Sequence, residues 1–426
     1  MVQHDIKAKT WEIVQPSSPL PNSVDTSPIV FHIPESFHYT LLNESFYYIK
    51  FRLVYSDLSA LAETRHVALQ NFAPVICFAD QTVSINGKVL ENHDGQGHYI
   101  NYLKTLLCAS PEAKEGVLKQ ALWLPDEPAL MTDDTDIGAT SNKNLKTRNR
   151  LIEKSRQCEA VCPLGFDIAG TGRLFPPSTA MTITFQRTPS TVCIIGKANT
   201  ADEGEKRIIL EIQQMELLVR RVEPYDDTSK QLQQLLHSPL GLIYPFVAWR
   251  PRVFNIPKSV STLDAVCFTN GIIPQRLIVV VIETTRKNGL LTNNSMKFAP
   301  NGVKAAYVER NGVRLPNTGI SFGEDDVMKA LLHFEEAFGF SSDFGIDCSK
   351  YETTHFILAW DLSEARNAAS KKLLAKQEVG TVKLHLDLEA PTSQELSVLA
   401  FGEFVQTVQL QKDRSVTYMD MVSVTS

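Results

Sequence analysis

The part of the sequence closest in pattern to a ligand site is SINGKVLENHDGQGHYINYLKTLL, residues 84–107. It holds a Gly-Lys pair and then a G-x-G ahead of a helical pattern, and phosphate-binding loops are built from such parts. However, Val89 follows Lys88 where a Walker loop needs Ser or Thr, and no Gly precedes the pair at the required interval. A dinucleotide fingerprint would need a third Gly. We therefore predict that Asn86-Gly87 is a hairpin turn, because both residues tolerate positive φ.

Other residue types that carry chemistry occur without the spacing that chemistry requires. None of the ten histidines falls in an H-E-x-x-H or H-x-H pattern. His385 lies on the polar face of a predicted strand, and His32 and His38 flank Pro34, so we expect surface or turn histidines. No G-x-S-x-G elbow is present for a nucleophilic serine. The sequence predicts no catalytic residues, no metal ligands and no cofactor, and therefore no enzyme.

Paired acids and cysteines are also better explained by structure than by catalysis. Asp133-Asp134 falls in a predicted loop and Asp325-Asp326 at a predicted helix start, where solvation and the helix dipole favour carboxylates. The one close cysteine pair, Cys158 and Cys162, has no second pair or nearby His to complete a zinc set. An odd number of scattered, apolar-flanked cysteines predicts buried free thiols in a reducing compartment. They are Cys77, Cys108, Cys158, Cys162, Cys193, Cys267 and Cys348.

One basic cluster remains as a candidate contact for phosphate or an acidic partner. It lies in NKNLKTRNRLIEKSRQ, residues 142–157, where six basic residues outnumber the single Glu153. A solvated loop is the alternative, and no aromatic residue interleaves the cluster for stacking on bases. The six basic residues are Lys143, Lys146, Arg148, Arg150, Lys154 and Arg156.

Length and charge restrict the class of protein. A chain of 426 residues exceeds the ~250 to 300 residues at which single cores stop growing, so we expect two units. A net charge of −6 excludes a field that draws the whole molecule onto nucleic acid or an acidic membrane. The N-terminus lacks a signal-peptide core, and the apolar run LIVVV at 277–281 is too short to span a bilayer. We expect a cytosolic product without a membrane span.

Alternating apolar and polar residues predict a mainly antiparallel β protein. In FYYIKFRLVY at 46–55 and TVKLHLDLEA at 381–390, apolar side chains alternate with charged ones. Three helices are predicted, at 98–107, 111–122 and 323–340. The segment 208–222 fits both a helix and a strand, and periodicity does not decide between them.

Two long stretches, 126–150 and 224–241, lack a clear period and predict irregular surface segments. The second lies near mid-chain and carries Pro224, Pro239 and Gly241, so we predict a domain boundary there. Strands, helical inserts and strands again in each half indicate two related β-sandwiches in tandem. From the residues alone, shell proteins, lectin-like binders and scaffolds all fit this class.

The order of short motifs along nearly the whole chain narrows these alternatives. The motifs are SPIVFHIPES, FYYIKFRLVY, VSINGKVLE, YINYLKTLL, LKQALW, GFDIAGTGRLF, TITFQR, LLVRRVEP, IYPFVAWRPRVFNIP, GIIPQRLIVVVIE, ILAWDL, VKLHLDLEAP and VLAFGEFVQTVQLQKDRSV. Their order and spacing resemble the hexon-like, double jelly-roll major capsid proteins of Polinton/Maverick elements and of the adintovirus and adomavirus groups.

The resemblance implies an all-β fold of two tandem eight-stranded antiparallel jelly rolls, with a few short helices in loops. The domains it implies are an N-terminal arm at 1–24, a first jelly roll at 25–223, a linker at 224–241, a second jelly roll at 242–415 and a C-terminal tail at 416–426. The Pro-punctuated segment VQPSSPLPNSVDTSP suits an arm that becomes ordered on assembly.

The implied function is a major capsid protein that forms pseudo-hexagonal trimers and an icosahedral shell around double-stranded DNA. Its expected partners are other copies of the chain and a penton-type minor capsid protein, and its expected location is the virion. The basic cluster at 142–157 offers a weak contact to packaged DNA or an acidic partner. The alternative is a jelly-roll minor capsid or receptor- or ligand-binding protein, which would need only one jelly roll.

Overall fold

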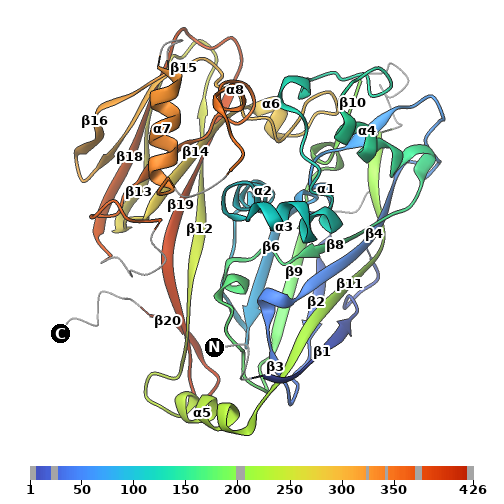
Figure 1. Cartoon of the computed structure of the whole chain (residues 1–426), viewed down its shortest axis with the longest axis vertical. Coiled ribbons are helices and arrows are strands. Elements are labelled where there is room, and N and C mark those ends of the chain that lie inside the picture. The colour runs from blue at the N-terminus through green and yellow to red at the C-terminus, as the bar shows by residue number, and fades with distance from the viewer. Residues whose placement is uncertain are drawn as a thin grey trace.

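The computed structural model describes residues 6–20, 27–197, 207–322, 326–340, 344–369 and 377–419. Two β-sheet units lie side by side, the first drawn in blue to green and the second in yellow to red (Figure 1). The last long strand of the first unit, β11 (Ile208–Pro224), leads through helix α5 (Asp226–Leu236) into β12 (Leu242–Ile256), which opens the second unit. The polypeptide therefore crosses from one unit to the other at the α5 end of the molecule.

The first unit has two main antiparallel sheets and three short strands. One sheet has the order β1-β11-β4-β8 and the other the order β2-β9-β6-β7. The short β3 (Tyr39–Thr40) pairs with β11, and β5 (Val67–Leu69) pairs with β10 (Ile194–Gly196). The other bounds are β1 (Ile6–Val14), β2 (Ile29–Ile33), β4 (Phe46–Tyr55), β6 (Phe78–Ile85), β7 (Lys88–Val89), β8 (Cys158–Pro163) and β9 (Met181–Arg187).

The second unit is built in the same way. Its sheets have the orders β12-β19-β14-β17 and β13-β18-β15-β16, and the short β20 (Val416–Tyr418) pairs with β19. The remaining bounds are β13 (Thr262–Ile272), β14 (Arg276–Glu283), β15 (Val303–Arg310), β16 (Val313–Ser321), β17 (Leu358–Asp361), β18 (Val379–Leu388) and β19 (Leu396–Leu410).

The two units share one topology. With β3, β5, β10 and β20 set aside, each unit has eight described strands, of which the first, eighth, third and sixth form one sheet in that order. The second, seventh, fourth and fifth form the other sheet. This is the strand order of an eight-stranded jelly roll. The expected fold class, a double jelly roll, is confirmed.

Residues 1–24 were expected to form an arm, and the structure differs for the described part of that segment. Strand β1 pairs with β11 from Ile6 to Val14 and is the first strand of the first jelly roll. Of the four prolines that suggested an arm, Pro16, Pro19 and Pro28 follow this strand, and Pro21 lies outside the described residues. The tail expected at 416–426 likewise begins with β20, while residues 1–5, 21–26 and 420–426 lie outside the described residues.

Most helices are inserted into two equivalent connections of the two jelly rolls. The connection between the third and fourth strands carries α1 in the first unit and α6 in the second. The connection between the fifth and sixth strands carries α2, α3 and α4 in the first unit and α7 and α8 in the second. The bounds are α1 (Ala73–Ile76), α2 (Gly97–Cys108), α3 (Pro111–Glu115), α4 (Lys143–Arg150), α6 (Thr284–Lys287), α7 (Val327–Ala337) and α8 (Cys348–Thr353). Short 3-10 turns are η2 (Leu42–Glu44), η3 (Val117–Ala121), η4 (Pro128–Leu130), η5 (Glu153–Ser155), η6 (Asp167–Thr171) and η7 (Ser190–Val192).

The structure confirms two of the three predicted helices and corrects several other predictions. Helices α2 and α7 match 98–107 and 323–340, whereas the helix predicted at 111–122 breaks at Gly116 into α3 and η3. The undecided segment 208–222 is strand β11, with side chains that alternate between buried and partly exposed.

The two stretches predicted to be irregular contain helices. Helix α4 lies within 126–150, where the side chain of Asn142 accepts a hydrogen bond from Leu145 N–H and caps its start. Helix α5 lies within 224–241, with Asp226 and Asp227 in its first turn, where the helix dipole favours acids. Few apolar residues in either helix are buried, and the periodic signal is correspondingly weak.

The core is formed by apolar residues that alternate with polar ones along the strands, as the sequence predicted. In β4, Tyr47, Ile49, Phe51 and Leu53 are buried while Lys50 and Arg52 lie on the other face. In β18 the alternate residues from Val382 to Leu388 are buried in the same way. One continuous hydrophobic cluster runs through both units. The two jelly rolls therefore share a core and are held as one body.

Candidate functional site

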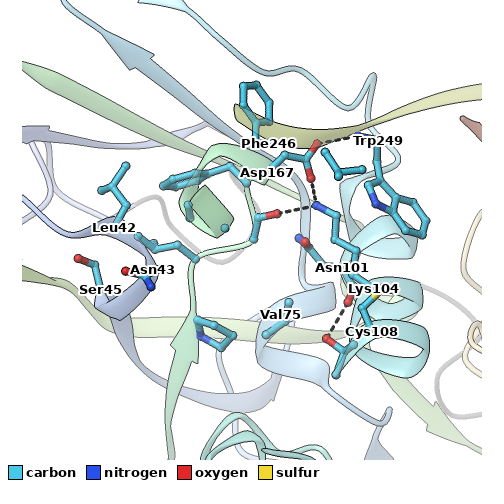
Figure 2. A pocket seen from close by; sticks show the side chains of 18 of the residues that line it. Leu42, Asn43, Ser45, Val75, Asn101, Lys104, Cys108, Asp167, Phe246 and Trp249 are labelled. Atoms are coloured by element: carbon cyan, nitrogen blue, oxygen red, sulfur yellow. Dashed lines mark hydrogen bonds and ion pairs between the residues drawn. The ribbon is translucent and has the colours of Figure 1, made fainter. Parts of the chain in front are cut away.

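One hollow lies in the junction, by which we mean the contact between the two jelly rolls. It is a cavity of about 570 Å³ with walls from both units (Figure 2). The first unit contributes η2, α2 and η6, and the second contributes β12. Its walls include Leu42, Asn101, Lys104, Cys108, Asp167, Phe246 and Trp249.

Asp167 joins the two units at this cavity. Its Oδ2 accepts a hydrogen bond of 2.7 Å from the backbone N–H of Trp249, on the edge strand β12 (Figure 2). Its Oδ1 pairs with the ammonium group of Lys104, on α2. Further along β12, toward α5, Arg173 donates to the carbonyl of Ile243 at 2.5 Å. Side chains of the first unit thus satisfy backbone groups along the outer edge of β12, which would otherwise be unpaired.

A buried polar cluster lies behind Asp167. Glu91 accepts hydrogen bonds from the backbone N–H groups of Asp167 and Ile168, the latter at 2.5 Å. His93 Nε2 lies 3.4 Å from Asp167 Oδ2. Burial raises the pKa of Glu91 and lowers that of His93 to about 4, so the imidazole is neutral at pH 7. Burial lowers the pKa of Lys104 to about 8, against the opposing effect of the Glu91 charge, and the ammonium form still dominates at pH 7.

The cluster has the donor types of a metal site, but its carboxylates already have partners. Ligand atoms of Glu91, His93 and Asp167 lie within 4.8 Å of one another. Both carboxylates, however, already bind backbone N–H groups, and the Lys104 ammonium supplies the positive charge beside them. The geometry favours a hydrogen-bonded contact between the two units over a cation site. We call this contact, formed by Glu91, His93, Lys104 and Asp167 with the backbone of Trp249, the buried lock.

A second polar contact joins the units at the helical end. Asp133 forms a bidentate pair with Arg286, at 2.7 and 2.8 Å, and also accepts from Asn294 N–H at 3.1 Å. Burial acts to raise the pKa of Asp133, but its hydrogen bonds and the Arg286 charge outweigh it and the pKa is lowered. The expectation that Asp133 is simply solvated is therefore wrong. Asp325 lies outside the described residues, and Asp326 pairs with Lys329 at 2.6 Å.

A third contact lies at the α5 end. The rings of Phe175 and Tyr244 stack with centroids 4.4 Å apart, and the Tyr244 hydroxyl donates to the carbonyl of Leu174 at 3.0 Å. Close by, the side chain of Asn86 donates to the carbonyl of Arg414 at 2.9 Å. Side-chain contacts therefore join the two jelly rolls at the cavity, at the helical end and at the α5 end of the junction.

The candidate phosphate loop at 84–107 is a structural element of this junction. Asn86 and Gly87 have φ values of 48° and 81° and connect β6 to β7, which confirms the predicted hairpin turn. At Gly97, a Cβ atom would lie 2.8 Å from the carbonyl oxygen of Ala79, so this glycine lets α2 approach β6 closely. Gly87 and Gly97 therefore allow a turn and a close helix–strand contact. Asn86 connects the hairpin to the second unit through its hydrogen bond to Arg414.

The basic cluster at 142–157 is dispersed by the fold. Arg148 is fully buried on α4, where it pairs with Asp126 at 2.5 Å and donates to the carbonyl of Leu69. Lys154 pairs with Glu63 at 2.5 Å on the surface. The helix α4 takes up half of the stretch predicted to be a loop, and the exposed basic residues of the stretch are Lys143, Arg150, Lys154 and Arg156.

The remaining candidates are placed in the core or on the surface. Cys158 and Cys162 are buried on β8, and burial raises the pKa of both thiols, that of Cys158 to about 11. The ring of His385 stacks on Tyr307 with centroids 4.3 Å apart, beside Asp264. His32 is exposed next to Thr182.

The residues of the buried lock were not predicted from the sequence. Glu91, His93, Lys104 and Asp167 lie on three separate segments of the first unit, and their partner Trp249 lies on the second. The run GFDIAG, which contains Asp167, carries no sequence signal beyond its place among the ordered motifs. The Glu-x-His spacing at residues 91 and 93 was the one local signal.

Comparison with known proteins adds fold-level findings. No protein-family model matches the chain. An uncharacterized protein of Caenorhabditis elegans is 21% identical over 368 residues, which covers 84% of this chain and 80% of that protein. Within the described part of the chain, no helix is long and apolar enough to cross a membrane.

Solved structures share the architecture over almost the whole chain. The mavirus major capsid protein matches 98% of this chain and 93% of its own length, with a TM-score of 0.61 and 11% identity. A chain of the Sputnik virophage structure matches 99% and 90%, with a TM-score of 0.65 and 12% identity. The Faustovirus major capsid protein matches 94% and 90%, with a TM-score of 0.59 and 8% identity. The chain therefore has the double jelly-roll fold found in viral major capsid proteins.

Proposed function

We propose that this chain, whose fold is that of viral major capsid proteins, is itself a major capsid protein. The observation that carries the proposal is the duplicated jelly roll, with one strand order repeated in two units that a buried polar lock holds together. Shape similarity over 90% or more of two virophage chains supports it. In such a protein the activity is geometric, because a rigid block tiles a shell through repeated contacts.

The proposed assembly is a homotrimer of roughly hexagonal outline. Three chains supply six jelly rolls of equal topology, and a cyclic arrangement would place them around one axis. We propose residues 6–224 and 242–418 as the two jelly rolls, with α5 between them. The trimers would form an icosahedral shell around double-stranded DNA, closed at the vertices by a penton-type minor capsid protein, so that the chain is located in the virion.

The exposed basic residues near α4 are a weaker proposal. Arg148 is buried, whereas four basic residues of the cluster are exposed: Lys143, Arg150, Lys154 and Arg156. Phosphate contacts of this kind add affinity without sequence preference and weaken with salt. They would give packaged DNA or an acidic partner a loose contact.

The alternative function, a ligand-binding or minor capsid protein without a shell-forming role, would use the junction cavity. One observation favours it, since the cavity of about 570 Å³ has room for a small ligand and its walls include apolar side chains such as Leu42 and Phe246 beside the polar Asn101. Two complete jelly rolls exceed what such a binder needs, and this ranks the capsid function first.

Light scattering and negative-stain electron microscopy of the purified chain test the proposal. We expect trimers of hexagonal outline, and shells or shell fragments at higher concentration. A chain that stays monomeric across concentration and salt, whether or not it binds a small molecule, contradicts the capsid function.

A further inference from the structure

The cavity in the junction is open to solution and has mainly apolar walls, which come from both jelly rolls (Figure 2). Its volume of about 570 Å³ lies within the range of about 300 to 1,000 Å³ that is usual for small-molecule sites. Cys108 and Val247, which line it, are exposed and mark its open side. The buried apolar side chains of its walls are Leu42, Phe72, Val75 and Phe166 from the first unit and Phe246 and Trp249 from the second. A molecule in this cavity would therefore touch both jelly rolls.

The ammonium group of Lys104 offers a hydrogen-bond donor in this cavity. Such a group carries three N–H donors. The structure gives it two acceptors, the carboxylate of Asp167 and, at 3.4 Å, the carbonyl of Gly165. Within the described part of the chain no third acceptor contacts it, and the Lys104 side chain is 21% exposed. The centre of the Trp249 ring lies 6.0 Å from Lys104 Nζ, so an acceptor oxygen bound to Lys104 would lie close to an apolar wall.

The charges around the cavity favour a neutral molecule. Lys104 and Asp167 are the charged side chains among its described lining residues, and they pair with each other. Burial lowers the pKa of Lys104 to about 8 against the opposing effect of neighbours that include Glu91 and Glu403, so further acidic groups lie behind this wall. An anionic head group would be repelled by these carboxylates and a cationic one by Lys104. Either would also lose hydration among apolar side chains, which is costly for an ion.

We propose that the junction cavity binds a small, neutral, mainly apolar molecule through one acceptor oxygen that receives a hydrogen bond from Lys104. The hydrocarbon part of this molecule lies against the apolar walls of both units. Medium-chain ketones, alcohols and esters form the chemical class. Because only the folded chain brings the two walls together, occupancy stabilises the junction as the ligand concentration exceeds Kd. The inference goes beyond the proposed capsid function and does not depend on it, since the cavity belongs to a single chain.

Three probes that differ in charge test the class of ligand. They are 2-octanone, octanoate and octylammonium, which are neutral, anionic and cationic at pH 7. In isothermal titration calorimetry of the full chain we expect saturable binding of 2-octanone, and binding at least about tenfold weaker for each charged probe, which corresponds to about 1.4 kcal/mol. Saturating 2-octanone should also raise the urea midpoint of unfolding. No saturable binding of 2-octanone, or equal binding of all three probes, would overturn the inference.

A substitution at the opening of the cavity, with a control on the same strand, tests the location. Val247→Trp places a large ring at the open side of the cavity, where Val247 on β12 is 45% exposed, and should weaken 2-octanone binding at least about tenfold. Val253→Trp is the control, because Val253 is 37% exposed on β12 and does not line the cavity, and its affinity should equal that of the wild type. The urea midpoint without probe verifies that both variants fold. Wild-type affinity in Val247→Trp, or weakened binding in Val253→Trp, would place the probe elsewhere and overturn the inference.

Lys104→Met tests the hydrogen bond, because it keeps an unbranched side chain and removes the donor. We expect it to weaken 2-octanone binding, and unchanged affinity would refute the role of Lys104. Since Lys104 is part of the buried lock, this variant loses stability, and the substitutions at Val247 and Val253 decide the question if it does not fold. Trimers that bind no 2-octanone would overturn this inference alone. A strictly monomeric chain that binds it would overturn the capsid function alone.

Discussion

The buried lock of the junction makes a quantitative prediction at Asp167. Asp167→Asn keeps an oxygen that can accept from the Trp249 N–H but removes the negative charge beside Lys104. The ammonium group can then lose its proton, and from a pKa of about 8 this costs about 1.4 kcal/mol at pH 7. We therefore expect the free energy of unfolding to fall by about 1 to 2 kcal/mol.

Asp167→Leu should lower the free energy of unfolding more than Asp167→Asn does, because it also leaves the buried Trp249 N–H without an acceptor. An orphaned group of this kind costs about 1 to 3 kcal/mol, so the total should reach about 2 to 4 kcal/mol. Asp387→Asn is the matched control, because Asp387 is exposed on β18, and it should change the free energy of unfolding by less than about 0.5 kcal/mol. Urea unfolding at pH 7, followed by tryptophan fluorescence, measures all three.

The pH dependence separates a lost charge from a lost contact. In the wild type, the pKa of Lys104 is about 8 when folded and near 10.5 when unfolded. Between these values the unfolded chain binds more protons, so this group makes stability rise with pH, by about 3.4 kcal/mol in total. In Asp167→Asn the rise should begin below pH 8, because the folded pKa of Lys104 falls further. An unchanged urea midpoint and an unchanged pH profile in Asp167→Asn would refute the charge lock.

Three further changes test other parts of the structure. Gly87→Ala should destabilise by about 1 kcal/mol in thermal unfolding, because φ is 81° there although the space is open, whereas Gly170→Ala, with open space and ordinary φ, should be neutral. Asp133→Asn should cost about 1.5 to 3 kcal/mol by losing the charged contact to Arg286. Because the pKa of Asp133 is lowered in the folded state, this stabilisation is present above its ordinary value and is lost as acid protonates the carboxylate, so wild type and variant should converge at low pH. His98→Phe should flatten the loss of stability on acidification from pH 6.5, because burial lowers the pKa of His98 to about 3 and only the unfolded chain takes up that proton; an unchanged acid profile would contradict this.

The parts of the fold that were predictable are those whose signal is local. Alternation in β4 and β18 appears within ten residues, because a strand with one buried face must repeat every two positions. The Asn86-Gly87 turn is equally local. Strand β1 was missed because its partner β11 lies about 200 residues further along the chain, and as an edge strand it exposes most of its side chains.

The parts of the site that were missed depend on long-range contacts. Arg148 looked like one of six surface cations, yet it is fully buried because Asp126 and two backbone carbonyls surround it. Asp133 looked solvated, and Arg286, which neutralises it, comes from the other jelly roll. Neither partner could be inferred from the neighbouring residues. A short-range pattern shows which residues are charged, but the fold decides which charges meet.

The contacts that join the two jelly rolls within the chain are suited to fixing one arrangement of the two units. Inside the chain, the junction uses buried charges and backbone hydrogen bonds, which lose much stability when one partner is misplaced and so specify a single arrangement. This suits a contact that forms once, during folding.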